Sequence, residues 1–161
     1  MKPRSLVPKK VFFTSGIGVA DDSLLSFEYA LRDAKIERFN LVPVSSIAPP
    51  KVKIIDVDEG LKYLKAGQVV FCVLARFTSN EKDKEIFSSV GVALPKDKKY
   101  NGYFTEYHGY YTGKEEGHAK NMAKNMLQSM YNIEIDKGFE IFKKASVSNY
   151  TTVVSAAIFV F

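Results

Sequence analysis

The segment Asn40-Leu41-Val42-Pro43-Val44-Ser45-Ser46-Ile47-Ala48-Pro49-Pro50 places two adjacent serines between a short apolar run and a double proline. The run from Phe39 to Val44 predicts a β-strand that ends at the serines. Proline fixes φ and lacks a backbone donor, so Pro49 and Pro50 interrupt regular structure and hold the residue before each of them extended. One interpretation of the two serines is therefore a simple turn, in which their hydroxyls bind the local backbone.

A second interpretation gives Ser46 a chemical role. If the peptide bond between Ser45 and Ser46 is held under strain, the hydroxyl of Ser46 can attack the preceding carbonyl and convert the amide into an ester. Elimination from the ester cleaves the chain and leaves dehydroalanine, which hydrolyses to a pyruvoyl group. A pyruvoyl ketone forms a Schiff base with a substrate amine and acts as an electron sink. The serine segment by itself does not decide between the two interpretations.

Three further blocks of sequence accompany the serine segment. In their order and approximate spacing, the four blocks resemble the pyruvoyl-dependent arginine decarboxylase family, over most of the chain from the first predicted helix onward. The blocks are Phe27-Glu28-Tyr29-Ala30-Leu31, the serine segment, Val92-Ala93-Leu94-Pro95-Lys96-Asp97-Lys98 and Gly102-Tyr103-Phe104-Thr105-Glu106-Tyr107-His108-Gly109. The resemblance implies a carbon–carbon lyase that converts L-arginine to agmatine and CO2, for polyamine synthesis or acid resistance.

The resemblance also implies roles for single residues. Ser46 would become the pyruvoyl cofactor, and scission would leave a β chain of residues 1–45 and an α chain of residues 46–161. Asn40 matches a family asparagine near the scissile peptide, where its amide could donate to the oxyanion on the Ser45 carbonyl. Glu106 matches the active-site glutamate, which could protonate the substrate carbon after CO2 leaves. The aromatic residues around Glu106 predict a desolvated carboxyl group that keeps its proton.

Glu28 stands where the family has an aspartate that contacts the substrate guanidinium, and Leu31 would wall the aliphatic part of that pocket. A glutamate still pairs bidentately with a guanidinium, but it is one methylene longer. The residues alone favour an ion-paired glutamate on a helix edge. Two alternatives therefore stay open: a pyruvoyl decarboxylase of another amino acid, and an unprocessed, non-catalytic oligomeric binding module.

Length and hydropathy patterning predict one domain. The 161 residues are 46% hydrophobic and 13% aromatic, enough for a substantial core. Two helices and too many strands for one covered sheet predict an α+β fold, the αββα four-layer sandwich of two sheets with outer helices that the family has. The expected strands are 10–14, 39–44, 69–77, 86–94, 103–107, 145–149 and 151–161. The first expected helix runs from a cap at Asp21 or Asp22 to about Lys35, and its inward residues are Leu24, Phe27, Leu31 and Ala34. The second expected helix begins at a Thr112–Glu115 capping box. Its inward residues are Ala119, Met122, Ala123, Met126, Leu127 and Met130.

Composition bears on partners and location. The net charge of +5 is scattered and forms no basic stripe with base-stacking aromatics, so we expect no nucleic-acid partner. The single Cys72 lies in an apolar run and indicates a buried, reduced thiol. No apolar run approaches a membrane span, so we expect no membrane association and a cytoplasmic location. We expect neither a metal nor pyridoxal phosphate. The resemblance implies a homotrimer of processed protomers, or a dimer of trimers, with active sites between neighbours.

Overall fold

A computed structural model describes residues 6–161 of the chain. Within this range the elements follow one another in the order β1 (Lys10–Ala20), α1 (Ser23–Asp33), β2 (Asn40–Pro43), β3 (Ile47–Ala48), β4 (Lys53–Ile54), α2 (Val57–Leu61), β5 (Val69–Ser79), β6 (Glu85–Pro95), β7 (Gly102–Tyr110), α3 (His118–Tyr131), β8 (Ile135–Ser146) and β9 (Tyr150–Val160).

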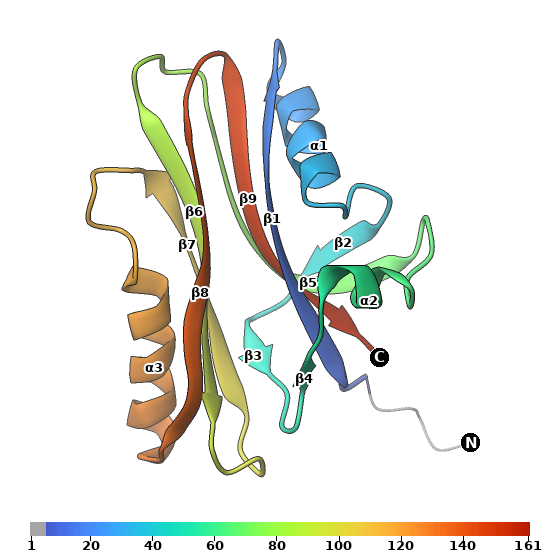
Figure 1. Ribbon diagram of the computed structural model, residues 1–161, viewed down its shortest axis with the longest axis vertical. Helices are drawn as coiled ribbons and strands as arrows, with labels where there is room; N and C mark the ends of the chain where they lie inside the picture. The colour runs from blue at the N-terminus through green and yellow to red at the C-terminus, as the bar shows by residue number, and fades with distance from the viewer. Residues whose placement is uncertain (1–5) are drawn as a thin grey trace.

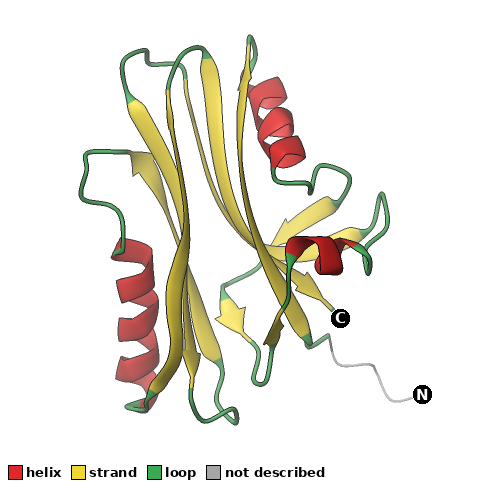
Figure 2. Cartoon of the chain, in the orientation of Figure 1, coloured by secondary structure: helices red, strands yellow, loops and turns green. Residues whose placement is uncertain are grey.

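The strands form two sheets that pack face to face (Figure 1). One sheet has the order β2-β5-β9-β1-β4, and the other has the order β3-β7-β6-β8. Helices α1 and α2 cover the outer face of the five-stranded sheet, and α3 covers the outer face of the four-stranded sheet (Figure 2). The predicted α+β domain with two sheets is confirmed for the described residues.

Both faces of the five-stranded sheet are buried where its central strands lie. Val11 and Phe12 are adjacent in β1 and have no solvent exposure, yet Val11 packs between the sheets and Phe12 packs under the helices. Successive side chains of a strand point to opposite faces, so a strand between two layers reads as a continuous apolar run. The same reason explains why β5 has an uninterrupted apolar run and why Cys72 is buried within it. Burial, and to a smaller extent the negative charge of Glu106, raises the pKa of the Cys72 thiol to about 12.

Helix α1 packs against β1 through small residues. Asp22 caps the helix, as predicted, by accepting hydrogen bonds from two backbone N–H groups. The predicted end of the first strand at residue 14 is wrong, because β1 continues through Gly16 and Gly18 to Ala20. A Cβ at Gly18 would lie 2.0 Å from the Ser26 carbonyl oxygen, so the glycines permit a close approach of helix and strand.

The predicted inward stripe of α1 is correspondingly wrong in part. Leu24 is 72% exposed, and the helix buries Ser26, Ala30 and the following Ala34. Phe27 and Leu31 flank this small-residue contact and are only partly buried. The reason is geometric, since large side chains at the contact would hold the helix away from the glycines of β1.

Helix α3 begins later than the sequence predicts. Thr112 and Glu115 do interact, but the helix starts at His118, and Glu115 instead accepts hydrogen bonds from the backbone N–H groups of residues 112–114. Glu140 of β8 accepts from the N–H groups of Gly117 and Lys120 and so satisfies the exposed donors of the helix start. The predicted inward face is confirmed for Ala119, Ala123 and Leu127, which are buried, and is wrong for the three methionines, which are exposed.

The last strands also differ from the prediction. Residues 145–149 form the end of β8 and the turn that follows, and β8 itself starts at Ile135. Charged residues such as Asp136, Lys137, Lys143 and Lys144 interrupt its apolar residues, so no continuous apolar run and no strict alternation marks this strand. Strand β9 matches the predicted final strand. The short β3, β4 and α2 were not predicted, because two to five residues carry no periodic signal.

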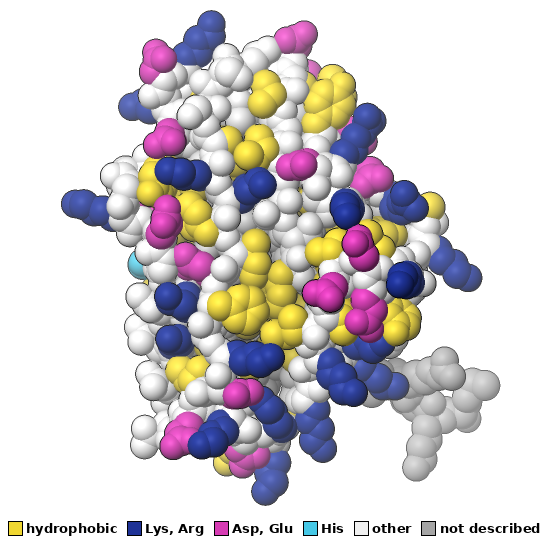
Figure 3. Space-filling model, in the orientation of Figure 1, with side chains coloured by type: hydrophobic (Ala, Val, Ile, Leu, Met, Phe, Trp, Pro, Cys, Tyr) yellow, Lys and Arg dark blue, Asp and Glu magenta, His cyan; other side chains and the backbone are white. Residues whose placement is uncertain are grey.

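Charged side chains are mixed over the face that Figure 3 shows, with lysines and arginines more frequent toward its lower end. In the described part of the chain, no helix is both long and apolar enough to cross a membrane. The cytoplasmic location stays a prediction.

The close contact at Gly18 should make it intolerant of a side chain. We expect Gly18→Ala to lower the free energy of unfolding by about 3 kcal/mol, because the new Cβ meets helix backbone that cannot turn aside. Urea unfolding measures this loss. The exposed neighbour is the control, since Val19→Thr should change the same quantity by no more than about 0.5 kcal/mol. An unchanged midpoint for Gly18→Ala would show that α1 can move outward without cost.

Glu115 should stabilise the fold in a pH-dependent way. Its hydrogen bonds with Thr112 and with backbone N–H groups lower the pKa of its carboxyl from 4.5 to about 2. A lowered folded-state pKa contributes stability that is fully present above the unfolded pKa and is lost as the pH falls toward the folded one. Glu115→Gln should therefore lower the urea midpoint at pH 7, and the difference from the parent should shrink between about pH 4.5 and 2. A difference independent of pH would contradict this.

Candidate active site

The two serines lie where the chain crosses from one sheet to the other. The Val44 N–H donates to the Cys72 carbonyl at 2.9 Å and so extends the parallel pairing of β2 with β5. The Phe104 N–H donates to the Ser46 carbonyl at 2.9 Å and begins the antiparallel pairing of β3 with β7. The peptide bond between Ser45 and Ser46 is therefore fixed on both sides, each time by a different sheet.

Ser46 adopts a backbone conformation that is unusual for a residue with a side chain. Its φ is +64°, in the left-handed region, where an L-residue is less stable by about 1–2 kcal/mol. Two anchored ends that lie only two residues apart explain why the chain accepts this cost. The backbone at Ser46 is thus not that of a relaxed turn, whereas strain in the Ser45–Ser46 peptide bond itself stays a prediction.

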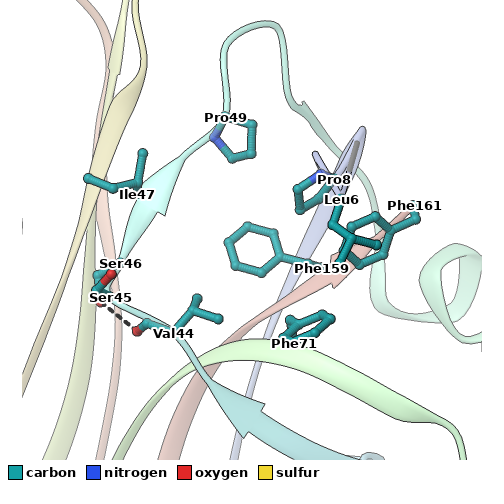
Figure 4. A pocket seen from close by; sticks show the side chains of 10 residues that line it. All are labelled: Leu6, Pro8, Val44, Ser45, Ser46, Ile47, Pro49, Phe71, Phe159 and Phe161. Carbon is teal, nitrogen blue, oxygen red and sulfur yellow. Dashed lines mark hydrogen bonds between the residues drawn. The ribbon is translucent and has the colours of Figure 1, made fainter. Parts of the chain in front are cut away.

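The hydroxyl of Ser46 donates to Glu106 Oε1 at 2.7 Å. A second acceptor, the Val44 carbonyl oxygen, lies 3.5 Å from Ser46 Oγ, at the limit of a hydrogen bond (Figure 4). A hydroxyl has one proton, so the shorter contact with the carboxylate is the dominant one. A nucleophile that donates to a neighbouring base is the arrangement used for nucleophilic chemistry.

Glu106 reaches Ser46 from the centre of β7, where it lies opposite Val90 of β6. The side chain is exposed in the single chain, so the predicted desolvation by its aromatic neighbours is not found. Tyr103 and Tyr107 lie an odd number of residues away and occupy the other face of the strand. Phe104 shares the face of Glu106 but is buried in the core between the sheets. His108 shares the face of Glu106 and stacks on Phe77.

An apolar pocket of about 280 Å³ opens beside the serines. It brings together the segment before β1, the crossover, one residue of β5 and the C-terminal end of the chain (Figure 4). Its lining consists of Leu6, Pro8, Val44, Ser45, Ser46, Ile47, Pro49, Phe71, Phe159 and Phe161. Three phenylalanines, Phe71, Phe159 and Phe161, contribute to this lining.

The family model for pyruvoyl-dependent arginine decarboxylases matches residues 10–161. The chain belongs to this family. It is 54% identical over 156 residues to "Pyruvoyl-dependent arginine decarboxylase 1" of Archaeoglobus fulgidus, with 96% of this chain and 99% of the relative covered. It is 48% identical over 160 residues to "Pyruvoyl-dependent arginine decarboxylase 1" of Methanosarcina acetivorans, with 96% and 97% covered. Membership of the family establishes that this protein is a pyruvoyl-dependent arginine decarboxylase, which is a lyase with a pyruvoyl prosthetic group.

A solved structure titled as a pyruvoyl-dependent histidine decarboxylase at pH 8 aligns with 62% of this chain and 53% of its own. The identity is 17% and the TM-score is 0.47, so this likeness carries no argument about fold or substrate.

The residues of this family member fit the formation of a pyruvoyl group at Ser46. The Ser46 hydroxyl, a carboxylate that can accept its proton and a turn with positive φ lie together. The Phe104 N–H was missed by sequence reasoning, although it holds the Ser46 carbonyl. Backbone donors carry no residue-type signal, and only the register of β3 against β7 reveals this one.

Asn40 is not brought to the scissile peptide within one chain. It begins β2, and its side-chain N–H donates to the Gly67 carbonyl at 2.8 Å. Ser45 is five residue steps further along the chain, a span of roughly 16 Å if those steps are extended. A contact of Asn40 with the Ser45 carbonyl would have to come from another copy of the chain.

Glu28 and Leu31 also lie away from Ser46. They belong to α1, on the outer face of the five-stranded sheet, and neither lines the pocket beside the serines. The Glu28 carboxylate accepts a hydrogen bond from Arg32, and Leu31 packs partly buried against the core under the helix. One protomer therefore joins Ser45, Ser46 and Glu106, and leaves the predicted guanidinium site elsewhere.

Proposed function

We propose that this family member cleaves itself between Ser45 and Ser46, producing a β chain of residues 1–45 and an α chain of residues 46–161 that begins with the pyruvoyl group. The observation that carries the proposal is the 2.7 Å hydrogen bond from the Ser46 hydroxyl to Glu106 Oε1. The carboxylate accepts the hydroxyl proton while Oγ attacks the Ser45 carbonyl carbon. The C–N bond then breaks, the Ser46 nitrogen takes up the proton, and an ester links the two residues.

The later steps of processing need only a base and water. Removal of the Ser46 Cα proton expels the Ser45 carboxylate and leaves a dehydroalanine, whose enamine tautomerises to an imine. Water adds to the imine carbon and ammonia leaves, so a ketone replaces the amine. The left-handed strain at Ser46 is released once the chain is cut, which favours scission.

After scission the antiparallel pairing of β3 with β7 keeps residue 46 in place, because the Phe104 N–H still binds its carbonyl. The pyruvoyl ketone supplies an electrophile for the substrate amine and an electron sink. Glu106 projects from the neighbouring strand, within reach of that position, and we assign it the delivery of a proton to the carbon that loses CO2.

We assign recognition of the arginine side chain to Glu28 and Leu31, and donation to the oxyanion on the Ser45 carbonyl to Asn40. These residues lie far from Ser46 in one chain, so we propose that a neighbouring copy in a homotrimer, or a dimer of trimers, completes each site. Exposed apolar side chains around the crossover support an interface there. They are Leu6, Val42, Ile47, Val69 and Phe161. We also propose that each protomer is an αββα sandwich, in which the helices cover the outer faces of the two sheets.

Intact mass under denaturing conditions tests the cleavage. We expect two fragments of about 5 and 13 kDa at ~110 Da per residue, the larger one reactive toward a carbonyl reagent. Ser46→Ala should remain one chain of 18.1 kDa. Ser45→Ala is the matched control and should still be cut, because the nucleophile is unchanged. A parent chain that stays intact even after incubation at higher temperature would support the non-catalytic binding module instead.

The role of Glu106 is tested by the rate of self-cleavage. Glu106→Gln should slow the appearance of the two fragments about 100-fold, because the amide cannot accept the hydroxyl proton. Glu134→Gln changes an exposed glutamate that is paired with Lys96, and it should cleave at the parent rate. Equal rates for Glu106→Gln and the parent would mean that water or another group accepts the proton.

A further inference from the structure

The carboxylate of Glu28 already holds a guanidinium, that of Arg32 one helical turn away. Arg32 Nε lies 2.7 Å from Oε1 and 2.7 Å from Oε2, so a single N–H group faces both carboxylate oxygens. That one N–H donates its hydrogen bond to Oε1, so Oε2 is in ion-pair contact with the same Nε but has no hydrogen-bond donor of its own among the described residues. The side chains of Glu28 and Arg32 are 38% and 62% exposed.

This arrangement leaves Glu28 with unused binding capacity. Two parallel N–H···O bonds give a carboxylate and a guanidinium their strongest and most specific pairing. Arg32 is tied to the same helix and presents Nε alone. A free guanidinium from a substrate can present two N–H groups at once and satisfy Oε2 as well. An exposed i,i+4 ion pair contributes little to stability, so Arg32 can be displaced from Glu28.

We infer that Arg32 is a specificity-determining residue that occupies Glu28 until a substrate guanidinium displaces it. The inference rests on the proposed function, in which Glu28 receives the substrate side chain. A resident cation raises the substrate concentration needed for binding, because the arriving guanidinium must exchange with it. It also selects for arginine, since a lysine ammonium is a point charge that cannot make the two-donor fork and exchanges less well.

Steady-state kinetics of the processed enzyme test the inference. Arg32→Gln should lower the KM for arginine by about three- to five-fold, the size expected for removal of one exposed ion pair, and the change should fall on KM rather than kcat. Inhibition by lysine should strengthen by more than inhibition by agmatine, because a single ammonium then finds Glu28 free. Arg32→Lys retains the charge and the helix propensity, and its KM should lie between those of Arg32→Gln and the parent.

Arg38→Gln is the matched control. Arg38 is 63% exposed and lies 3.8 Å from Glu37, so its removal changes the net charge equally without touching Glu28. Its KM should equal that of the parent. A KM for Arg32→Gln that is unchanged or higher than the parent value overturns the inference.

Glu28→Gln separates this inference from the function on which it rests. A raised KM for Glu28→Gln together with no effect of Arg32→Gln would leave the proposed guanidinium site standing and overturn the competition. An unchanged KM for Glu28→Gln would overturn both. If both hold, the KM change caused by Arg32→Gln should disappear in the Glu28→Gln background, since the double-mutant cycle removes the shared contact.

Discussion

The crossover of residues 44–46 between the two sheets is the constraint on which the site depends. Val44 is bonded to β5 in one sheet and Ser46 to β7 in the other, so the chain has one residue in which to change direction. The left-handed conformation of Ser46 follows from this short connection. The same connection points the Ser46 hydroxyl at Glu106, because β7 supplies both the backbone donor and the carboxylate. Strain and chemistry thus have one structural cause.

The outer helices pack against the two sheets that the crossover connects. This packing is a close approach of helix backbone to strand glycines rather than an interlocking of large side chains. Gly18 of β1 and Gly91 of β6 each lie against helix backbone, where a Cβ would come within 2.0 and 2.2 Å of a neighbouring atom. This packing leaves the larger apolar residues of both helices partly exposed. It also leaves Glu28 at the margin of α1, where it can be reached from outside the protomer.

The predicted site residues fall into two groups that lie apart in a single chain. Ser46 and Glu106 lie together within one protomer, whereas Glu28 is held by Arg32 on the far side of a sheet. The arrangement is therefore consistent with the proposal that Ser46 and Glu106 act within one chain, whereas Asn40 and Glu28 reach them from a neighbouring copy.

The sequence by itself determined the strands with continuous apolar runs and a helix cap at Asp21 or Asp22, because these depend on residue types at short spacing. The reaction class came from the resemblance of four sequence blocks to a known family. That resemblance also pointed to Ser46 and Glu106. Their contact across 60 positions was decided by the register of β3 against β7, which two paired residues set and no periodicity records. The inward face of α1 likewise depended on Gly18, since the depth at which a helix packs is a property of the strand beneath it.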